Sequence, residues 1–261
     1  MKKLHFLSGL PRSGSTLLGS ILNKHDLIHV TPTSPIADLI CMTEESIKKL
    51  SVQYTFDESA LLTNTVHGIF EHGFSHTDKP IVFDKHRAWP RNLKIASSFV
   101  QNDFTGIVTY RPIPEVIVSY IKLIKKDPDN FIDNHLRKDG RPLNTRNRAD
   151  YLWRYYISDP YMSVQHGLHN SRDKLLMLSY DEITLHTTDT LKRIEDFFRV
   201  DTLSKLHLEN ITNTCAEDKD AAWGLKDLHT IRSTIRKTSD DPVEVLGKEL
   251  FDYYSQFDIK L

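Results

Sequence analysis

The chain is poor in cysteine and has no excess of either charge. Among its 261 residues are two cysteines, Cys41 and Cys215, too few for a disulfide framework and without metal-ligand spacing. We therefore expect a reducing compartment, the cytoplasm. With 34 lysines and arginines against 35 aspartates and glutamates, the chain has no overall positive field that would attract nucleic acid or an acidic membrane. Any anion-binding site must be local.

Long apolar runs are missing as well. The longest apolar stretches fall far short of the eighteen or so residues that a membrane-spanning helix needs, and the mean hydropathy is −0.41. The N-terminus is basic like that of a signal peptide, but His5 and the pair Pro11-Arg12 interrupt the following apolar segment too early. We expect an unprocessed, soluble protein without a membrane span.

Short apolar runs alternate with amphipathic segments along the chain. Runs typical of strands cover residues 4–8, 80–84, 104–110 and 174–180. Helical periodicity covers residues 16–22, 36–50, 57–74, 90–99, 114–125, 150–167, 190–198 and 242–257. This alternation predicts an α/β fold, a central parallel sheet flanked by helices, with ligands at the carboxyl ends of the strands. Because no linker or repeat divides the pattern, we expect residues 1–261 to form one domain.

Two segments interrupt this alternation. Residues 31–35 contain Pro32 and Pro35 and are expected to form a loop, with Ser34 as the N-cap of the next helix. Residues 128–148 are polar and basic, and they are expected to form a mobile loop that is either simply solvated or able to recruit an anionic substrate.

The glycines are few, ten in all, and two of them frame a loop after the first predicted strand. Residues Gly9 to Thr16 have the spacing of a phosphate-binding loop, in which backbone N–H groups point at an anion beside a helix N-terminus. Nucleoside triphosphatases use G-x-x-x-x-G-K-[ST], but here Ser15 replaces the lysine, and the positive charge is Arg12. A kinase would thus lack its main contact with the transferred phosphoryl group. A sulfuryl group carries less negative charge and can be held without a metal ion, so the loop indicates an activated sulfate donor.

The segment Phe6 to Leu18 resembles the 5′-phosphosulfate loop of sulfotransferases, which use 3′-phosphoadenylyl sulfate. The similarity is closest to bacterial members and, more distantly, to tyrosylprotein sulfotransferases, which also carry Pro-Arg-Ser-Gly. The resemblance implies a P-loop-type three-layer fold. It also implies donor contacts from the loop residues Pro11, Arg12, Ser13, Gly14, Ser15 and Thr16.

Two further segments resemble the same family. Arg111 follows a predicted strand and Ser119 comes eight residues later, which is similar to the 3′-phosphate motif; a guanidinium fork suits a phosphate. Asp84 to Trp89 resembles the bacterial Asp-Lys-x-Arg-x-Trp segment, and Lys85 falls where the tyrosylprotein enzymes keep a lysine for the bridging oxygen of the donor. An alternative interpretation makes Asp84 a Mg²⁺ ligand of a nucleoside triphosphatase.

Weaker similarities lie in the C-terminal half. Tyr180, at the end of a predicted strand, resembles a family residue that touches the adenosine end of the donor. Ser233 and Lys237 resemble the late loop that closes over the donor.

The resemblance implies in-line attack of an acceptor hydroxyl or amine on sulfur, with Arg12 and Lys85 stabilising the developing charge. A hydroxyl acceptor also needs a general base. Tyrosylprotein enzymes place a glutamate after the first helix, but this chain has none there. His86 is therefore the first candidate for the base, and Asp84 is the second.

The predicted function is sulfuryl transfer to a small-molecule, carbohydrate or peptide acceptor. One alternative is a nucleotide-binding or regulatory module that has kept the loop and lost catalysis, and a P-loop kinase is a weaker one. His67, His72 and His76 have spacings that could suggest a metal site on a helix, but no carboxylate cluster supports them, so we expect a polar helix face and no metal. The acceptor's identity and the oligomeric state cannot be predicted from the sequence.

Overall fold

The computed structural model describes residues 2–99, 104–214, 224–232, 234–238 and 240–261. Within these residues, five parallel strands form one sheet in the order β2-β3-β1-β4-β5. The strands are β1 (Lys3–Gly9), β2 (Ile28–Thr33), β3 (Ile81–Lys85), β4 (Gly106–Tyr110) and β5 (Leu175–Ser179). The first strand of the chain therefore lies at the centre of the sheet, between β3 and β4.

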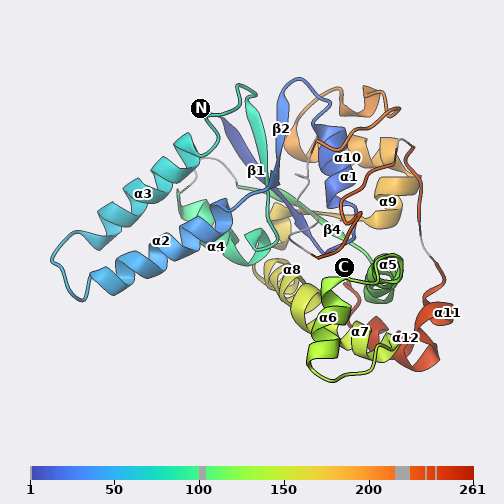
Figure 1. The fold of residues 1–261 in the computed structure, drawn as a ribbon. Helices are drawn as coiled ribbons and strands as arrows, with labels where there is room; N and C mark the ends of the chain where they lie inside the picture. The colour runs from blue at the N-terminus through green and yellow to red at the C-terminus, as the bar shows by residue number, and fades with distance from the viewer. Residues whose placement is uncertain (1, 100–103, 215–223, 233, 239) are drawn as a thin grey trace.

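Helices cover both faces of the sheet, which confirms the predicted α/β architecture (Figure 1). One face packs against α1 (Ser15–Leu22), α9 (Tyr180–Leu185) and α10 (Thr187–Phe198). The other packs against α2 (Ile36–Leu50), α3 (Glu58–His72), α4 (Trp89–Phe99) and α8 (Ser158–Asn170). Trp89 is fully buried on this second face, against Phe6, Phe70 and Phe104, so it belongs to the core.

A third group of helices packs around Leu10, the residue that follows β1. Its members are α5 (Ile113–Lys126), α6 (Phe131–Lys138), α7 (Thr145–Leu152), α11 (Pro242–Leu246) and α12 (Lys248–Ser255). The described residues also form the π-helix η1 (Trp153–Ile157) and the 3₁₀ turns η2 (Arg172–Lys174) and η3 (Leu203–Lys205). In the part of the chain that the structure describes, no helix has the length and apolar character needed to cross a bilayer.

The expected loop at residues 31–35 was partly wrong, because β2 continues through Pro32. β2 is an edge strand whose pairing with β3 is irregular, and an edge with an irregular register tolerates a proline. Ser34 does contribute to the start of α2, since its Oγ accepts a hydrogen bond from the Ile36 N–H at 3.1 Å, but the N-cap residue itself is Pro35.

The mobile basic loop expected at residues 128–148 was wrong. Most of this segment forms α6 and the start of α7, and the side chains of Asn130 and Asn144 cap the two helices. Asp133 on α6 and Arg148 on α7 form an ion pair of 2.7 Å that is mostly buried. The basic residues therefore belong to ordered helices, and part of their charge is neutralised within the protein.

His5 on β1 makes the stability of the fold depend on pH. Its ring lies between Phe83 and Phe198, at centroid distances of 5.2 and 4.7 Å, and its Nδ1 lies 3.2 Å from Thr105 Oγ1. Burial lowers the pKa of His5 from 6.5 to about 4. The folded protein therefore keeps this ring neutral, whereas the unfolded chain takes up a proton near pH 6.5. The contribution of His5 to the free energy of unfolding is therefore fully present above that pH, and it is lost as the pH falls toward 4.

Through this residue we expect the free energy of unfolding to fall by on the order of 2 kcal/mol between pH 7 and pH 4.5. Urea unfolding at both pH values measures the loss in the wild type, in His5→Phe and in a control, His169→Phe, which changes an exposed histidine. The loss should be smaller in His5→Phe than in the other two proteins. Equal losses in all three would show that His5 has no such role.

Candidate functional site

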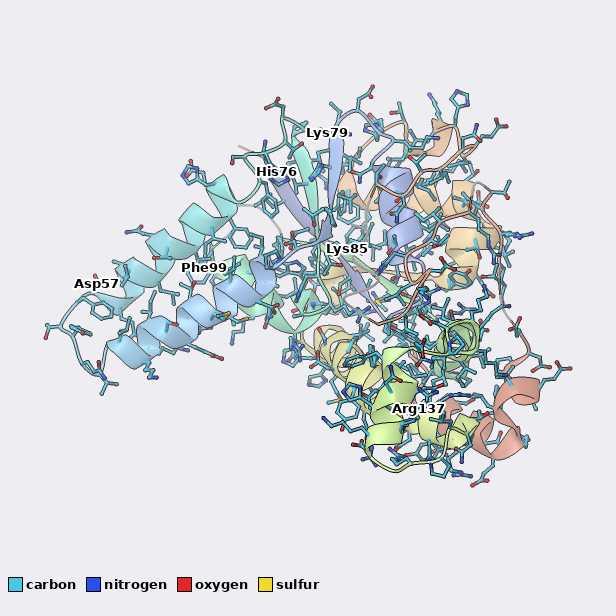
Figure 2. The ribbon with its side chains drawn as sticks, viewed as in Figure 1. Asp57, His76, Lys79, Lys85, Phe99 and Arg137 are labelled. Atoms are coloured by element: carbon cyan, nitrogen blue, oxygen red, sulfur yellow. The ribbon has the colours of Figure 1, made fainter. Side chains whose placement is uncertain are left out.

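A cavity of about 450 Å³ opens at the carboxyl edge of the sheet, where a parallel fold predicts ligands. Its walls come from the loop after β1, the residues after β3, one side of α5 along its length, the start of α9 and described residues between 227 and 238. Figure 2 shows Lys85 near the middle of the molecule, at the end of β3. Most of the predicted site residues line this cavity: Pro11, Arg12, Gly14, Ser15, Thr16, Lys85, His86, Arg111, Ser119 and Tyr180.

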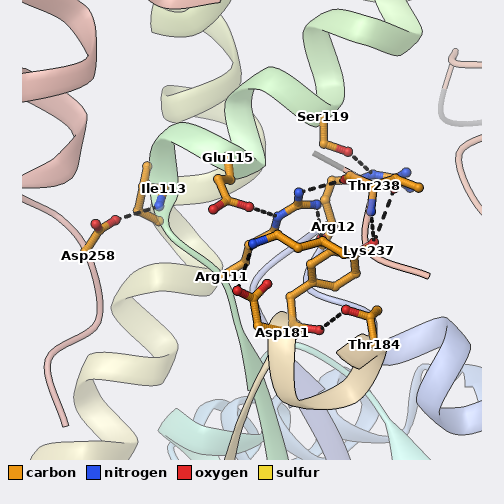
Figure 3. A network of polar contacts seen from close by, with 11 residues as sticks. Arg12, Arg111, Ile113, Glu115, Ser119, Asp181, Thr184, Lys237, Thr238 and Asp258 are labelled. Carbon is orange, nitrogen blue, oxygen red and sulfur yellow. Dashed lines mark hydrogen bonds and ion pairs between the residues drawn. The ribbon is translucent and has the colours of Figure 1, made fainter. Parts of the chain in front are cut away.

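The remaining predicted residues are placed differently. Ser13 is buried, and its Oγ lies 2.6 Å from Thr109 Oγ1, so its hydroxyl anchors the loop to β4 instead of facing a ligand. Lys237 pairs with Asp181 on α9 at 2.7 Å, at the edge of the site (Figure 3). Ser233 lies outside the described residues.

Glycine is required at both framing positions of the loop. Gly9 has a φ of +140°, and a Cβ there would lie 2.1 Å from the carbonyl oxygen of Thr109. Gly14 has a φ of +92° and immediately precedes α1, with the Tyr180 ring packed against it. The loop therefore lies tightly on β4 and leads directly into the N-terminus of α1, a position at which backbone N–H groups bind anions.

Arg12 has a left-handed backbone conformation, with a φ of 60°, which is uncommon for a residue other than glycine. Its side chain reaches α5, where Nε donates a hydrogen bond to Ser119 Oγ at 3.1 Å (Figure 3), and Nη1 donates to the Leu228 carbonyl. The structure thus brings together two residues that the sequence predicted separately, one from the 5′-phosphosulfate loop and one from the 3′-phosphate motif.

Arg111 is held in place by four contacts. Its side chain is only 3% exposed. Its Nε donates a hydrogen bond to Glu115 Oε2 at 3.0 Å. Its Nη1 donates to the Arg12 carbonyl at 3.3 Å, and its Nη2 donates to the Thr238 carbonyl at 3.0 Å (Figure 3). Its guanidinium also lies 4.1 Å from the centre of the Tyr180 ring. Glu115 was not among the predicted residues, although its spacing of four residues from Arg111 was a signal.

Lys85 brings a second buried cation to the loop. It is 7% exposed, and its Nζ donates a hydrogen bond to Thr16 Oγ1 at 3.0 Å. The loop lysine of a nucleoside triphosphatase would stand at position 15, one residue before Thr16. In this protein the end of β3 therefore supplies a cation near the place where nucleoside triphosphatases have the lysine of the loop itself.

Asp84 is buried beneath the site and does not line the cavity. It is 2% exposed, and its two oxygens accept hydrogen bonds from Trp89 Nε1 at 2.8 Å and Thr31 Oγ1 at 3.2 Å. Thr31 Oγ1 in turn accepts from the backbone N–H of Lys85 at 2.8 Å. Burial raises the pKa of Asp84, while these hydrogen bonds oppose the shift. This geometry suits neither a general base nor a Mg²⁺ ligand; Asp84 instead fixes the end of β3 that carries Lys85.

His86 lines the cavity with both ring nitrogens engaged. Its Nδ1 lies 3.2 Å from the backbone nitrogen of Ala88, and its Nε2 lies 3.3 Å from Asp38 Oδ2. Because a backbone N–H can only donate, Nδ1 is the acceptor and Nε2 carries the proton toward Asp38. The sequence analysis missed Asp38, because only the packing of α2 against the end of β3 brings it to His86.

The histidines that were considered for a metal site do not form one group. His76 Nε2 lies 3.4 Å from Nε2 of His29 on β2. Within the described residues, no three histidine, cysteine or carboxylate side chains are grouped as metal ligands.

A family model described as "Sulfotransferase domain" matches residues 3–243. Among solved structures, the sulfotransferase domain from the curacin biosynthetic pathway is similar, with 15% identity, a TM-score of 0.54 and coverage of 100% of this chain and 93% of that chain. The sulfotransferase domain from the Synechococcus PCC 7002 olefin synthase is also similar, with 16% identity, a TM-score of 0.50 and coverage of 96% of this chain and 94% of that chain. At these identities the two structures show the fold. No curated protein matches the sequence.

Proposed function

Because this chain belongs to the sulfotransferase domain family, we propose that it transfers a sulfuryl group from 3′-phosphoadenylyl sulfate to a hydroxyl or amine acceptor. The observation that carries the proposal is the arrangement of two groups of cations around one cavity. Lys85 lies at the phosphate-binding loop, while Arg111 and Arg12 meet at the first turns of α5. A donor with a 5′-phosphosulfate and a 3′-phosphate uses both groups, whereas a nucleoside triphosphate uses only the first.

Each group has a distinct task in this reaction. The loop residues Gly14 to Thr16 bind the 5′-phosphosulfate beside the N-terminus of α1, and Lys85 stabilises the negative charge that develops on the bridging oxygen. Arg111 and Ser119 hold the 3′-phosphate. Because Arg12 contacts Ser119, we assign it to this group and not, as the sequence suggested, to the developing charge. The acceptor oxygen or nitrogen attacks sulfur in line, the bond from sulfur to the bridging oxygen breaks, and adenosine 3′,5′-bisphosphate leaves.

For the proton of a hydroxyl acceptor we retain His86 as the proposed general base. In the described conformation its Nδ1 accepts from Ala88, so the ring must turn to take a proton from the acceptor. His86→Gln should then lower kcat with a hydroxyl acceptor by at least about 100-fold. A variant that keeps the wild-type kcat would exclude His86.

The engaged nitrogens of His86 favour one other candidate, a module that binds the nucleotide without catalysing transfer. Binding is tested by thermal shift: we expect adenosine 3′,5′-bisphosphate to raise the melting temperature without Mg²⁺, and ATP to have little effect with or without it. A larger shift with Mg·ATP would contradict the proposed function. Consumption of radiolabelled donor in the presence of an acceptor mixture then separates the enzyme from the binding module.

A further inference from the structure

Arg87 is a cation of the cavity to which the proposed function assigns no task. It lies two residues beyond Lys85 and lines the cavity. Its backbone is fixed, because its carbonyl accepts hydrogen bonds from Ser8 Oγ at 3.2 Å and Ser163 Oγ at 2.8 Å. Its guanidinium, by contrast, makes no hydrogen bond or ion pair with any residue that the structure describes.

The carboxylates around Arg87 already have other partners. Asp159, at the start of α8, accepts two hydrogen bonds of 2.6 Å from Arg91, which lower its pKa, and Arg87 adds a smaller electrostatic contribution from nearby. Asp38 is directed at His86. The five N–H groups of the Arg87 guanidinium therefore remain for a ligand in the cavity.

One part of the cavity wall suits the body of an organic ligand. Tyr156 lies in the π-helical turn η1, one turn before Asp159, and such turns are frequent at functional sites. It lines the cavity together with Tyr120, whose ring centroid is 5.8 Å away, and the buried Leu123. Among the described residues, the Tyr156 hydroxyl has no hydrogen-bond partner. Burial raises the pKa of Tyr156 to about 12, so the phenol is neutral and does not repel an anion.

From this arrangement, and resting on the proposed function, we propose that the acceptor is an alcohol or phenol that carries a carboxylate, and that Arg87 binds this carboxylate. A guanidinium fork matches a carboxylate through two parallel hydrogen bonds. Because Arg87 and Lys85 line the same cavity, an acceptor anchored at Arg87 shares that cavity with the sulfuryl group held at the loop. The apolar part of the acceptor lies against Tyr156 and Leu123.

The test compares acids with their neutral amides. Calorimetric titrations of protein saturated with adenosine 3′,5′-bisphosphate use three pairs: 4-hydroxyphenylacetate, 3-(4-hydroxyphenyl)propionate and 10-hydroxydecanoate, each with its amide. We expect at least one acid to bind roughly 10- to 100-fold more tightly than its amide. Arg87→Gln should abolish this preference. Lys94→Gln, which removes an exposed charge on α4 outside the cavity, should keep it.

The outcomes separate this proposal from the proposed function. If the bisphosphate does not bind, the proposed function fails, and the acceptor assignment fails with it. If the bisphosphate binds but no acid is preferred over its amide, or Arg87→Gln keeps the preference, the acceptor assignment alone is overturned. Turnover with labelled donor adds a kinetic criterion: Arg87→Gln should raise KM for the acids. If Arg87→Gln instead lowered kcat equally for acids and amides and left KM unchanged, Arg87 would contact the sulfuryl group and not the acceptor.

Discussion

Replacing Arg111 by glutamine is expected to weaken the binding of adenosine 3′,5′-bisphosphate roughly 100-fold, because the variant loses charge-assisted hydrogen bonds to the 3′-phosphate. The wild-type guanidinium is pre-oriented by Glu115 and by the Thr238 carbonyl, so it enters the interaction with little loss of conformational freedom. A flexible or exposed arginine would contribute less.

The matched control for Arg111→Gln is a change of ligand. Adenosine 5′-monophosphate lacks the 3′-phosphate, so its weaker binding should be nearly the same in the wild type and in Arg111→Gln. Calorimetry with both nucleotides measures the difference, and urea unfolding checks that leaving Glu115 without Arg111 has not unfolded the variant. Equal losses for the two nucleotides would place Arg111 away from the 3′-phosphate.

Replacing Lys85 by methionine is expected to lower kcat by about 100- to 1,000-fold, with a much smaller change in affinity for the bisphosphate. In the proposed function Lys85 stabilises charge on the bridging oxygen, and that charge develops only as the bond to sulfur breaks. A buried lysine exchanged for a methionine of similar length keeps most of its packing, so stability should change little.

Single-turnover rates with labelled donor measure the effect of Lys85→Met directly. Lys94→Met, which removes an exposed charge on α4, is the control and should retain the wild-type rate. If Lys85→Met turned over donor at the wild-type rate, Lys85 would have no part in the chemical step. A large loss of bisphosphate affinity with little further loss of rate would reduce its role to ground-state binding.

Patterns local to the chain predicted most of the fold. The strands β1, β3, β4 and β5 were recognisable because each is a short buried apolar run that is followed by a segment with helical periodicity. β2 was missed because Pro32 is a loop signal that an edge strand can tolerate. The helix α6 and the start of α7 were missed because polar composition concealed a narrow buried face, with Ile132 and Leu136 of α6 inside.

Within the site, residue identities were easier to predict than side-chain directions. Motif spacing placed Arg12, Ser119 and Lys85 at the carboxyl edge of the sheet, and all three line the cavity. The contact of Arg12 with Ser119 depends on the left-handed conformation at Arg12 and on the position of α5, neither of which is encoded in nearby residues. The partner of His86 likewise comes from α2, at a distance along the chain that no local pattern spans.

The central position of β1 links the proposed nucleotide site to the folding of the whole domain. The loop that follows β1 lies between the ends of β3 and β4. The residues of these two strands that pair with β1 lie about 80 and about 100 positions further along the chain. The Arg111 guanidinium is oriented from still further away, by the carbonyl of Thr238. In the proposed function, a bound nucleotide therefore cross-links segments that are remote in sequence. Its binding energy would stabilise the assembled domain as a unit, since neither half of the chain contains the complete set of contacts.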